Sequence, residues 1–217
     1  MIVEDVFDSF ERKKIFHMKR TAKSHMQSVL NEKILVSIGH YLVVSGNAFT
    51  SWHDQSELKD IDVFVLGDDV AKHQLRKYLA NNGFKHKDIE YLKQTNPGAT
   101  HVQEVWEAVS HGKKYQFIFT DYWDRKDLIK EFDYKHCMVS YAVGKDIIYI
   151  TRSIYDAIDH KHLIVNNKNR VAEWRRNKFL QRGFTEPTKA EEQFVTWTNH
   201  AYQTFATRLT QELIEIA

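Results

Sequence analysis

Two segments set the architecture expected for this chain: YLVVSGN at residues 41–47 and KDIDVF at residues 59–64. The first is a short apolar strand that breaks at its serine and glycine, where the chain can turn tightly and bring backbone N–H groups close to a phosphate. In the second, the period of two of a strand points Asp60 and Asp62 to one face and sends the residues between them into the core. Two aligned carboxylates beside a phosphate cradle indicate magnesium-assisted nucleotide chemistry.

The composition is that of a folded protein with no excess of charge. The 217 residues can bury a hydrophobic core, and an apolar fraction of 42% with 28% charged residues is ordinary for a globular chain. The formal net charge of +2 means that any attraction for nucleic acid must come from local clusters. Cys137 is the only cysteine, which excludes an intrachain disulfide and a cysteine-based zinc site and indicates a reducing compartment.

The sequence carries no pattern expected of a membrane or secreted protein. Residues 1–5, MIVED, lack the basic-then-apolar order of a secretion signal. No apolar run approaches the ~18 residues that span a bilayer. We therefore expect a soluble, cytoplasmic protein with no membrane partner.

Hydrophobic periodicity predicts strands in the middle of the chain and helices at both ends. Helices are expected at residues 21–37, 48–52, 70–82, 123–132, 170–182 and 189–216. Strands are expected at residues 41–44, 60–66, 84–92, 102–109, 114–119, 137–143 and 146–151, with a turn at residues 95–99. This pattern predicts an α/β or α+β fold, a mixed sheet flanked by helices with a C-terminal helical part. We divide the chain into an α/β domain with a leading helix, residues 1–152, and a helical region, residues 153–217.

Several motifs follow one another in a fixed order. Val44-Ser45-Gly46-Asn47 precedes Asp60-Ile61-Asp62, and three further segments come later: YQFI at residues 115–118, EFDYKHC at residues 131–137 and KFLQRGF at residues 178–184. The first two resemble the paired signature of the DNA polymerase beta superfamily of nucleotidyltransferases, a hydrophobic residue with Gly and then Gly or Ser, followed by Asp-x-Asp or Asp-x-Glu. The later three resemble the YQLI, FDF…C and KY..RGF blocks of uncharacterised viral and cellular nucleotidyltransferase-like proteins.

This resemblance implies a nucleotidyltransferase-like fold and transfer of a nucleoside monophosphate from an NTP to a hydroxyl, with release of pyrophosphate. Asp60 and Asp62 would be the catalytic ligands of Mg²⁺ or Mn²⁺ ions that bridge the triphosphate. The NTP is expected to be ATP. Ser45, Gly46 and Asn47 would hold its β- or γ-phosphate.

A third acid is harder to place. Enzymes of this superfamily normally carry one on a neighbouring strand, where it completes a two-metal site and activates the attacking hydroxyl. The strand at residues 114–119 has Gln116 there, and an amide neither binds magnesium strongly nor takes a proton. We expect Asp133 to be the third catalytic carboxylate, and Asp121 is the second candidate. The competing interpretation of Asp133 is a residue of the turn between helix and strand. Asn47, where Ser or Gly is usual, is a second departure from the pattern.

Basic residues offer sites for the triphosphate or for a polynucleotide. Arg175, Lys178 and Arg182 fall three and four residues apart, on one face of a predicted helix. Lys59, beside Asp60, could pair with phosphate, and a solvated side chain is its alternative. The molecule that carries the acceptor hydroxyl is either an RNA, such as a tRNA, or a protein. The alternative function is a catalytically inactive nucleotidyltransferase-fold module that binds nucleotide, nucleic acid or protein.

Other residues with chemical potential are expected to be structural. The segment 160–162, His-Lys-His, is a conceivable metal pair that lacks a third ligand. Cys137 lies in an apolar run and is expected to be a buried, inert thiol. His53 is either a residue of the nucleotide pocket or a histidine on a helix surface. Three aromatic residues are expected in the core rather than stacked on bases: Trp174, Phe179 and Phe184.

Overall fold

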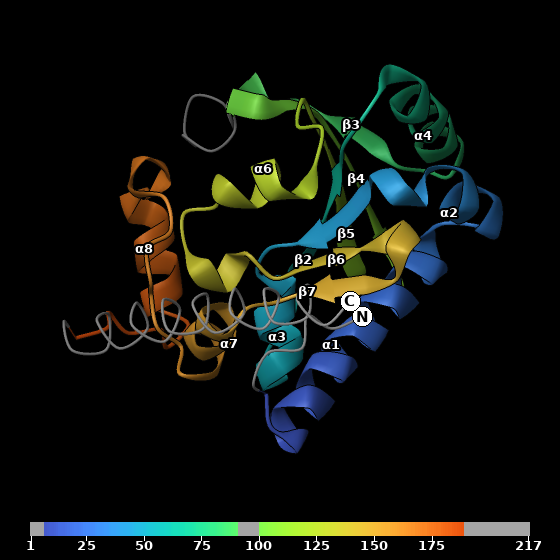
Figure 1. Ribbon diagram of the computed structural model, residues 1–217. Helices are drawn as coiled ribbons and strands as arrows, with labels where there is room; N and C mark the ends of the chain where they lie inside the picture. Colours follow the sequence, from blue (N-terminus) through green and yellow to red (C-terminus); the bar gives the residue numbers. More distant parts are fainter. Residues whose placement is uncertain (1–6, 91–99, 189–217) are drawn as a thin grey trace, which may run out of the picture.

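The computed structural model describes residues 7–90 and 100–188, in which helices flank a mixed sheet (Figure 1). The helices are α1 Ser9–Val29, α2 Glu32–Ile38, α3 Ala48–Asp54, α4 Asp69–Asn81, α6 Arg125–Lys130, α7 Arg152–Asp159 and α8 Glu173–Leu180. The strands are β1 Leu42–Ser45, β2 Asp60–Val65, β3 Lys85–Lys87, β4 Val102–Ser110, β5 Lys113–Thr120, β6 Ser140–Ala142 and β7 Ile147–Tyr149. Short 3₁₀ turns are η1 Gly39–Tyr41, η3 Lys135–Cys137, η4 Val143–Lys145 and η5 Lys168–Arg170.

The seven strands form one sheet in the order β3-β4-β5-β2-β1-β6-β7. The central pair β2 and β5 is parallel, and the other neighbouring strands are antiparallel. In this register Asp62 lies between Ser45 of β1 and Gln116 of β5. The predicted fold class, a mixed sheet flanked by helices, is confirmed.

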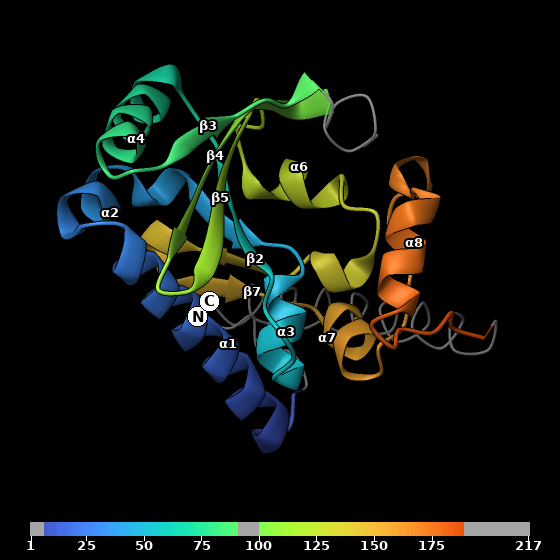
Figure 2. The same ribbon diagram turned by 180° about the vertical axis from the view of Figure 1, so that it is seen from behind.

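The two faces of the sheet are covered differently. Ile61, Val63 and Val65 of β2 are fully buried in a large core that they share with residues of α1, α3, α4 and α7. The opposite face has a smaller apolar cluster in which Phe64 of β2 packs with Leu128 of α6. Figures 1 and 2 show α1 on one side of the sheet and α6 with α8 on the other. On the face that carries Phe64, Asp60 and Asp62 at the start of β2 lie outside this apolar cluster.

The leading helical segment differs from the single helix predicted at residues 21–37. α1 begins at Ser9, where Asp8 and Glu11 form a capping box, and it ends at Val29. A separate helix α2 begins after Asn31, whose side chain accepts a hydrogen bond from the Ile34 N–H at 2.9 Å. The apolar periodicity continues through this break, so the prediction missed it. The local signals were present, because an asparagine cap and a capping box are both readable from sequence.

Most other elements lie near their predicted positions. α4 is capped by Asp68, as expected, and β4 and β5 form the predicted hairpin. α8, Glu173–Leu180, is shorter than the helix predicted at residues 170–182, and Arg170 is the last residue of η5. The predicted turn at residues 95–99 and helix at residues 189–216 lie outside the described residues.

α7 begins at Arg152 and places three side chains in the large core: Ile154, Tyr155 and Ile158. The division of the chain at residues 152 and 153 stays a prediction. In the described ranges, no helix combines the length and the apolar character needed to cross a membrane.

Candidate active site

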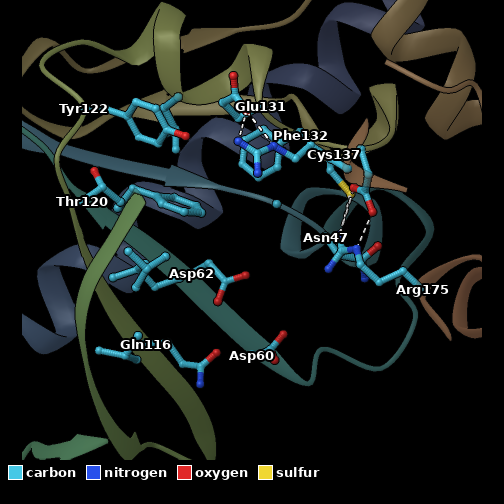
Figure 3. A pocket seen from close by; sticks show the side chains of 18 of the residues that line it. Asn47, Asp60, Asp62, Gln116, Thr120, Tyr122, Glu131, Phe132, Cys137 and Arg175 are labelled. Carbon is cyan, nitrogen blue, oxygen red and sulfur yellow. Dashed lines mark hydrogen bonds and ion pairs between the residues drawn. The ribbon is translucent and has the colours of Figure 1, made fainter. Parts of the chain in front are cut away.

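A cavity of about 270 Å³ is lined by residues of β2, β5, α6 and α8. Figure 3 shows Asp60 and Asp62 of β2 pointing into it, with Gln116 of β5 beside them and Arg175 of α8 on the far side. The side chains come from segments far apart in the sequence. The sheet register and the packing of α8 bring them together.

The predicted strand geometry of the acid pair is confirmed. Asp60 and Asp62 are half-buried on the cavity face, while Ile61 and Val63 between and after them are fully buried on the other face. Burial, followed by the charge of Asp60, raises the pKa of Asp62 to about 7. Ionisation of Asp62 beside Asp60 is thus unfavourable in the folded chain. Two carboxylates in this state suit a hard divalent cation, which takes oxygen ligands and would offset the repulsion.

Glycine at position 46 brings the turn after β1 against the acids. Gly46 has φ +92°, in the left-handed region, and a Cβ there would lie 3.2 Å from Asp62 Oδ2. The Gly46 N–H donates to the Cys137 carbonyl at 3.2 Å, so this backbone donor is occupied. Asn47 lines the cavity, and its buried amide oxygen accepts no hydrogen bond from the described residues. In this turn the Asn47 side chain is therefore the polar group available to a ligand.

Ser45 differs from its expected role. Its side chain is fully buried outside the cavity lining, and its hydroxyl donates to the Val139 carbonyl at 2.7 Å. Since a hydroxyl has one proton, it has none left for a phosphate in this conformation. The antiparallel pairing of β1 with β6 places the serine there.

Substitution Ser45→Ala is expected to lower the free energy of unfolding by about 1–2 kcal/mol, because it leaves a buried carbonyl unpaired. NTP affinity should stay near that of the parent chain. The two quantities are measured by urea unfolding and by calorimetric titration with NTP. A loss of NTP affinity of about tenfold or more would restore the phosphate-binding role of the hydroxyl.

The four basic residues predicted to bind phosphate separate into two groups. Arg175 and Lys178 of α8 line the cavity that contains the acids. Lys59 and Arg182 line a neighbouring groove of about 260 Å³ instead. Asn47 borders both spaces. Burial, and then the charge of Arg175, lower the pKa of Lys178, so the cavity already holds closely spaced positive charge.

Asp133, the expected third carboxylate, has another partner. It is only 4% exposed, and Arg175 donates to both of its oxygens, from Nε and from Nη2, the latter at 3.0 Å. Its own carbonyl accepts from the Asn166 N–H at 2.7 Å, a long-range backbone contact. Asp121 pairs with His101 at 2.9 Å, away from the cavity lining.

Within residues 7–90 and 100–188, no three histidine, cysteine or acidic side chains gather closely enough to hold a metal ion. Neither Asp133 nor Asp121 therefore joins Asp60 and Asp62 in one cluster. Asp133 stays apart from the acid pair because its buried carboxylate is already paired with Arg175 and would otherwise be left without a partner.

The inner end of the cavity contains residues to which the sequence analysis assigned no role in the site. Phe64 and Phe132 meet edge to face with ring centroids 5.6 Å apart. The buried Tyr122 hydroxyl has no partner among the described residues, and Arg170 donates from Nε to Glu131 at 2.7 Å. Phe64 could have been found, because it continues the spacing of Asp60 and Asp62 on β2. The other residues of this inner end arrive through tertiary packing.

Two of the three aromatic predictions are confirmed. Phe179 and Phe184 are buried in a small core beneath α8. Trp174 was expected with them, but it is 47% exposed and lines the cavity. It precedes Arg175, the residue that α8 directs at Asp133, so its side chain falls at the cavity rim.

The remaining candidates are structural. Cys137 is buried as expected, and burial raises the pKa of its thiol to about 12. His53 does not line the cavity: its Nε2 lies 3.1 Å from Asp159 Oδ1, and its ring packs edge-on against Tyr155. The rings of His160 and His162 stack with centroids 5.7 Å apart.

Comparisons with known proteins agree with this architecture. The family model described as "Gabija anti-defense 2 family protein" matches residues 13–161. No curated protein matches the chain.

Among solved structures, a tRNA-processing enzyme (apo form I) is similar with a TM-score of 0.53 at 11% identity, covering 91% of this chain and 49% of that one. The structure of a CCA-adding enzyme in apo form I gives a TM-score of 0.51 at 12% identity, covering 84% and 46%. A CCA-adding enzyme in complex with ATP gives 0.50 at 13% identity, covering 79% and 43%. The chain thus spans about half the length of the solved chains it matches. The likeness shows the fold, a nucleotidyltransferase-like mixed α/β sheet.

Proposed function

The chain belongs to the Gabija anti-defense 2 family, and on that premise we propose that it is a metal-dependent nucleotidyltransferase, which transfers a nucleoside monophosphate from an NTP to a hydroxyl. One observation carries this proposal: Asp60 and Asp62 point from one strand into a cavity whose other wall presents Arg175 and Lys178. Acids that suit a divalent cation thus face side chains that suit a triphosphate.

Each group has a role in this reaction. A bond forms between the acceptor oxygen and the α-phosphorus, and the bond from this phosphorus to the bridging oxygen breaks, so that pyrophosphate leaves with the electron pair. Asp60 and Asp62 would hold Mg²⁺ or Mn²⁺, which would supply positive charge to neutralise the triphosphate and to lower the pKa of the attacking hydroxyl. Arg175 and Lys178 orient the triphosphate. The hydroxyl proton passes to a carboxylate of the acid pair or to water.

The inner end of the cavity suits a nucleobase. Phe64 and Phe132 offer apolar ring surface, and the buried Tyr122 hydroxyl is available for a hydrogen bond. We propose ATP as the first NTP to test. Trp174 at the rim is placed to contact the sugar or a second base.

The acceptor is proposed to be the end of an RNA. The names of similar solved structures, a tRNA-processing enzyme and a CCA-adding enzyme, favour RNA over a protein hydroxyl. The family's name states an anti-defence role towards Gabija. We propose that nucleotidyl transfer in the cytoplasm serves that role, and that the chain belongs to a phage-type subgroup of this fold.

A second function has its own observation in support. Gln116 stands directly opposite Asp62 in the register of β2 and β5, where the superfamily pattern leads one to expect an acid. A site with two carboxylates and an amide could bind nucleotide without turning it over. The chain would then act as a binding module.

The test is transfer of label from α-³²P-NTP to RNA by the purified chain with Mg²⁺ or Mn²⁺. We expect labelled RNA, with ATP as the best donor, and a loss of at least about 10³-fold in the Asp60→Ala plus Asp62→Ala variant. Asp127→Ala, which removes an exposed acid of α6, is the matched control and should keep full activity. NTP that binds but is never transferred would establish the binding module instead. Absence of NTP binding would exclude both functions.

A further inference from the structure

Gln116 lies beside the acid pair at the position that a third acid would take. It faces Asp62 across the parallel strands β2 and β5, and its half-buried side chain lines the cavity. Adjacent strands are about 4.8 Å apart, so a side chain on β5 reaches the same space as those on β2. The orientation of the Gln116 amide decides whether its oxygen or its nitrogen faces the acids.

Glu107, a residue outside the cavity, sets the orientation of this amide. Glu107 of β4 is the register partner of Gln116 on the side away from β2, and it does not line the cavity. Gln116 Nε2 donates to Glu107 Oε2 at 3.1 Å. An ionised carboxylate only accepts hydrogen bonds, so the amide must turn its nitrogen towards Glu107. The chemistry of the pair assigns the amide orientation.

Glu107 is held in the ionised state by its neighbours. Lys114 Nζ lies 2.8 Å and Lys87 Nζ 3.6 Å from its Oε2. Two ammonium groups at these distances favour the carboxylate form of Glu107, which accepts hydrogen bonds and donates none. The Gln116 amide therefore meets an acceptor on this side.

With its nitrogen committed to Glu107, the amide turns its oxygen to the acids. Figure 3 shows the Gln116 oxygen on the side of Asp60 and the nitrogen directed away. No side chain or backbone group in the described part of the chain donates to this oxygen. Amide oxygens are established ligands of hard divalent cations. Two carboxylate oxygens and one amide oxygen thus converge on the cavity.

We propose that Gln116 is the third oxygen ligand of the metal site and that Glu107 is a positioning residue that orients its amide. This inference rests on the metal site of the proposed function. It assigns the third position to a neutral ligand in place of Asp133. The ligand set then carries one negative charge fewer than three carboxylates, which weakens metal binding and removes one candidate proton acceptor.

Exchange of the two side chains tests the inference without altering net charge. In the double variant Glu107→Gln plus Gln116→Glu, the amide of position 107 donates to the carboxylate of position 116, so the hydrogen bond is kept while the acid moves into the cavity. Mn²⁺ binding to the full chain is measured from the free-ion signal in electron paramagnetic resonance. We expect the exchange to tighten Mn²⁺ binding about tenfold. Gln116→Ala and Glu107→Gln alone should each weaken it about tenfold.

Glu104→Gln is the matched control on β4, because Glu104 pairs with Arg76 and Trp106 outside the cavity. It should leave Mn²⁺ affinity unchanged. Melting temperatures of all variants confirm that each is folded. If Asp60→Ala plus Asp62→Ala abolishes Mn²⁺ binding while the Gln116 and Glu107 variants bind as the parent does, the inference is overturned and the proposed function stands. If the double alanine variant still binds Mn²⁺ like the parent, the metal-dependent function itself fails.

Discussion

Asparagine in place of Asp62 is expected to abolish nucleotide transfer and, at pH 8, to make the folded chain more stable than the parent. Burial and the charge of Asp60 raise the pKa of Asp62 from its ordinary value of 3.8 to about 7 in the folded state. Between these two values the folded chain binds more protons than the unfolded chain. Its stability therefore falls as the pH rises through this range, and the full loss is present above pH 7.

Asparagine does not ionise, so the Asp62→Asn variant does not lose stability as the pH rises through this range. We expect the Asp62→Asn variant to gain on the order of 2–4 kcal/mol in free energy of unfolding at pH 8, and almost nothing below pH 4. Urea unfolding at both pH values measures the difference. Mg²⁺ should raise the melting temperature of the parent at pH 8 and leave that of the variant unchanged, since the cation offsets the same repulsion.

Asp127→Asn is the control for this experiment, because Asp127 is an exposed acid of α6 paired with Lys130. It should shift the free energy of unfolding by less than about 1 kcal/mol at either pH. A parent and an Asp62→Asn variant with equal stability at pH 8 would show that the acid pair is not under electrostatic strain.

Arg175→Ala is expected to be the most destabilising single change at the cavity, by about 3–5 kcal/mol. The reason is Asp133, which is 4% exposed and would be left as a buried carboxylate without its bidentate partner. The pair also joins α8 to the segment before η3, so its loss should loosen the wall that carries Lys178. Chemical unfolding measures the stability, and calorimetric titration measures an accompanying fall in NTP affinity.

The next residue provides the control. Arg176 pairs with Glu186 at 2.6 Å, but both side chains are exposed, at 40% and 57%, so Arg176→Ala should cost no more than about 1 kcal/mol. Asp133→Asn in the Arg175→Ala background should recover part of the stability, because it removes the unpaired charge. NTP affinity should not recover if Arg175 itself contacts the triphosphate. Equal stability of the Arg175→Ala and Arg176→Ala variants would contradict the structural role of the ion pair.

The cavity thus contains one stabilising ion pair, between Arg175 and Asp133, and two groups whose charges are unfavourable in the folded state. The acid pair repels, and Lys178 lies close to Arg175 with its pKa lowered. A cation on one wall and a triphosphate on the other would relieve each of these unfavourable interactions. Such strain is a common property of functional sites, because the groups are arranged for a ligand.

The parts of this protein that could be foreseen from its sequence are those set by local backbone geometry. The period of two along β2 placed Asp60 and Asp62 on one face, and the glycine after β1 identified the turn that lies against them. Both features depend on a few consecutive residues, so periodicity alone is enough. Helical spacing was not enough for the basic residues, because Arg182 shares the spacing of Arg175 and Lys178 and lines the neighbouring groove instead.

The partners of the polar groups depended instead on the folded arrangement. Pairing of β1 with β6 turned the Ser45 hydroxyl to Val139, and the packing of α8 gave Asp133 to Arg175, 42 residues away. The hairpin of β4 and β5 set Glu107 against Gln116 and so fixed which end of the amide meets the acids. A buried polar group takes whichever partner the long-range packing brings within reach, because leaving it unpaired costs more than any local preference can offset.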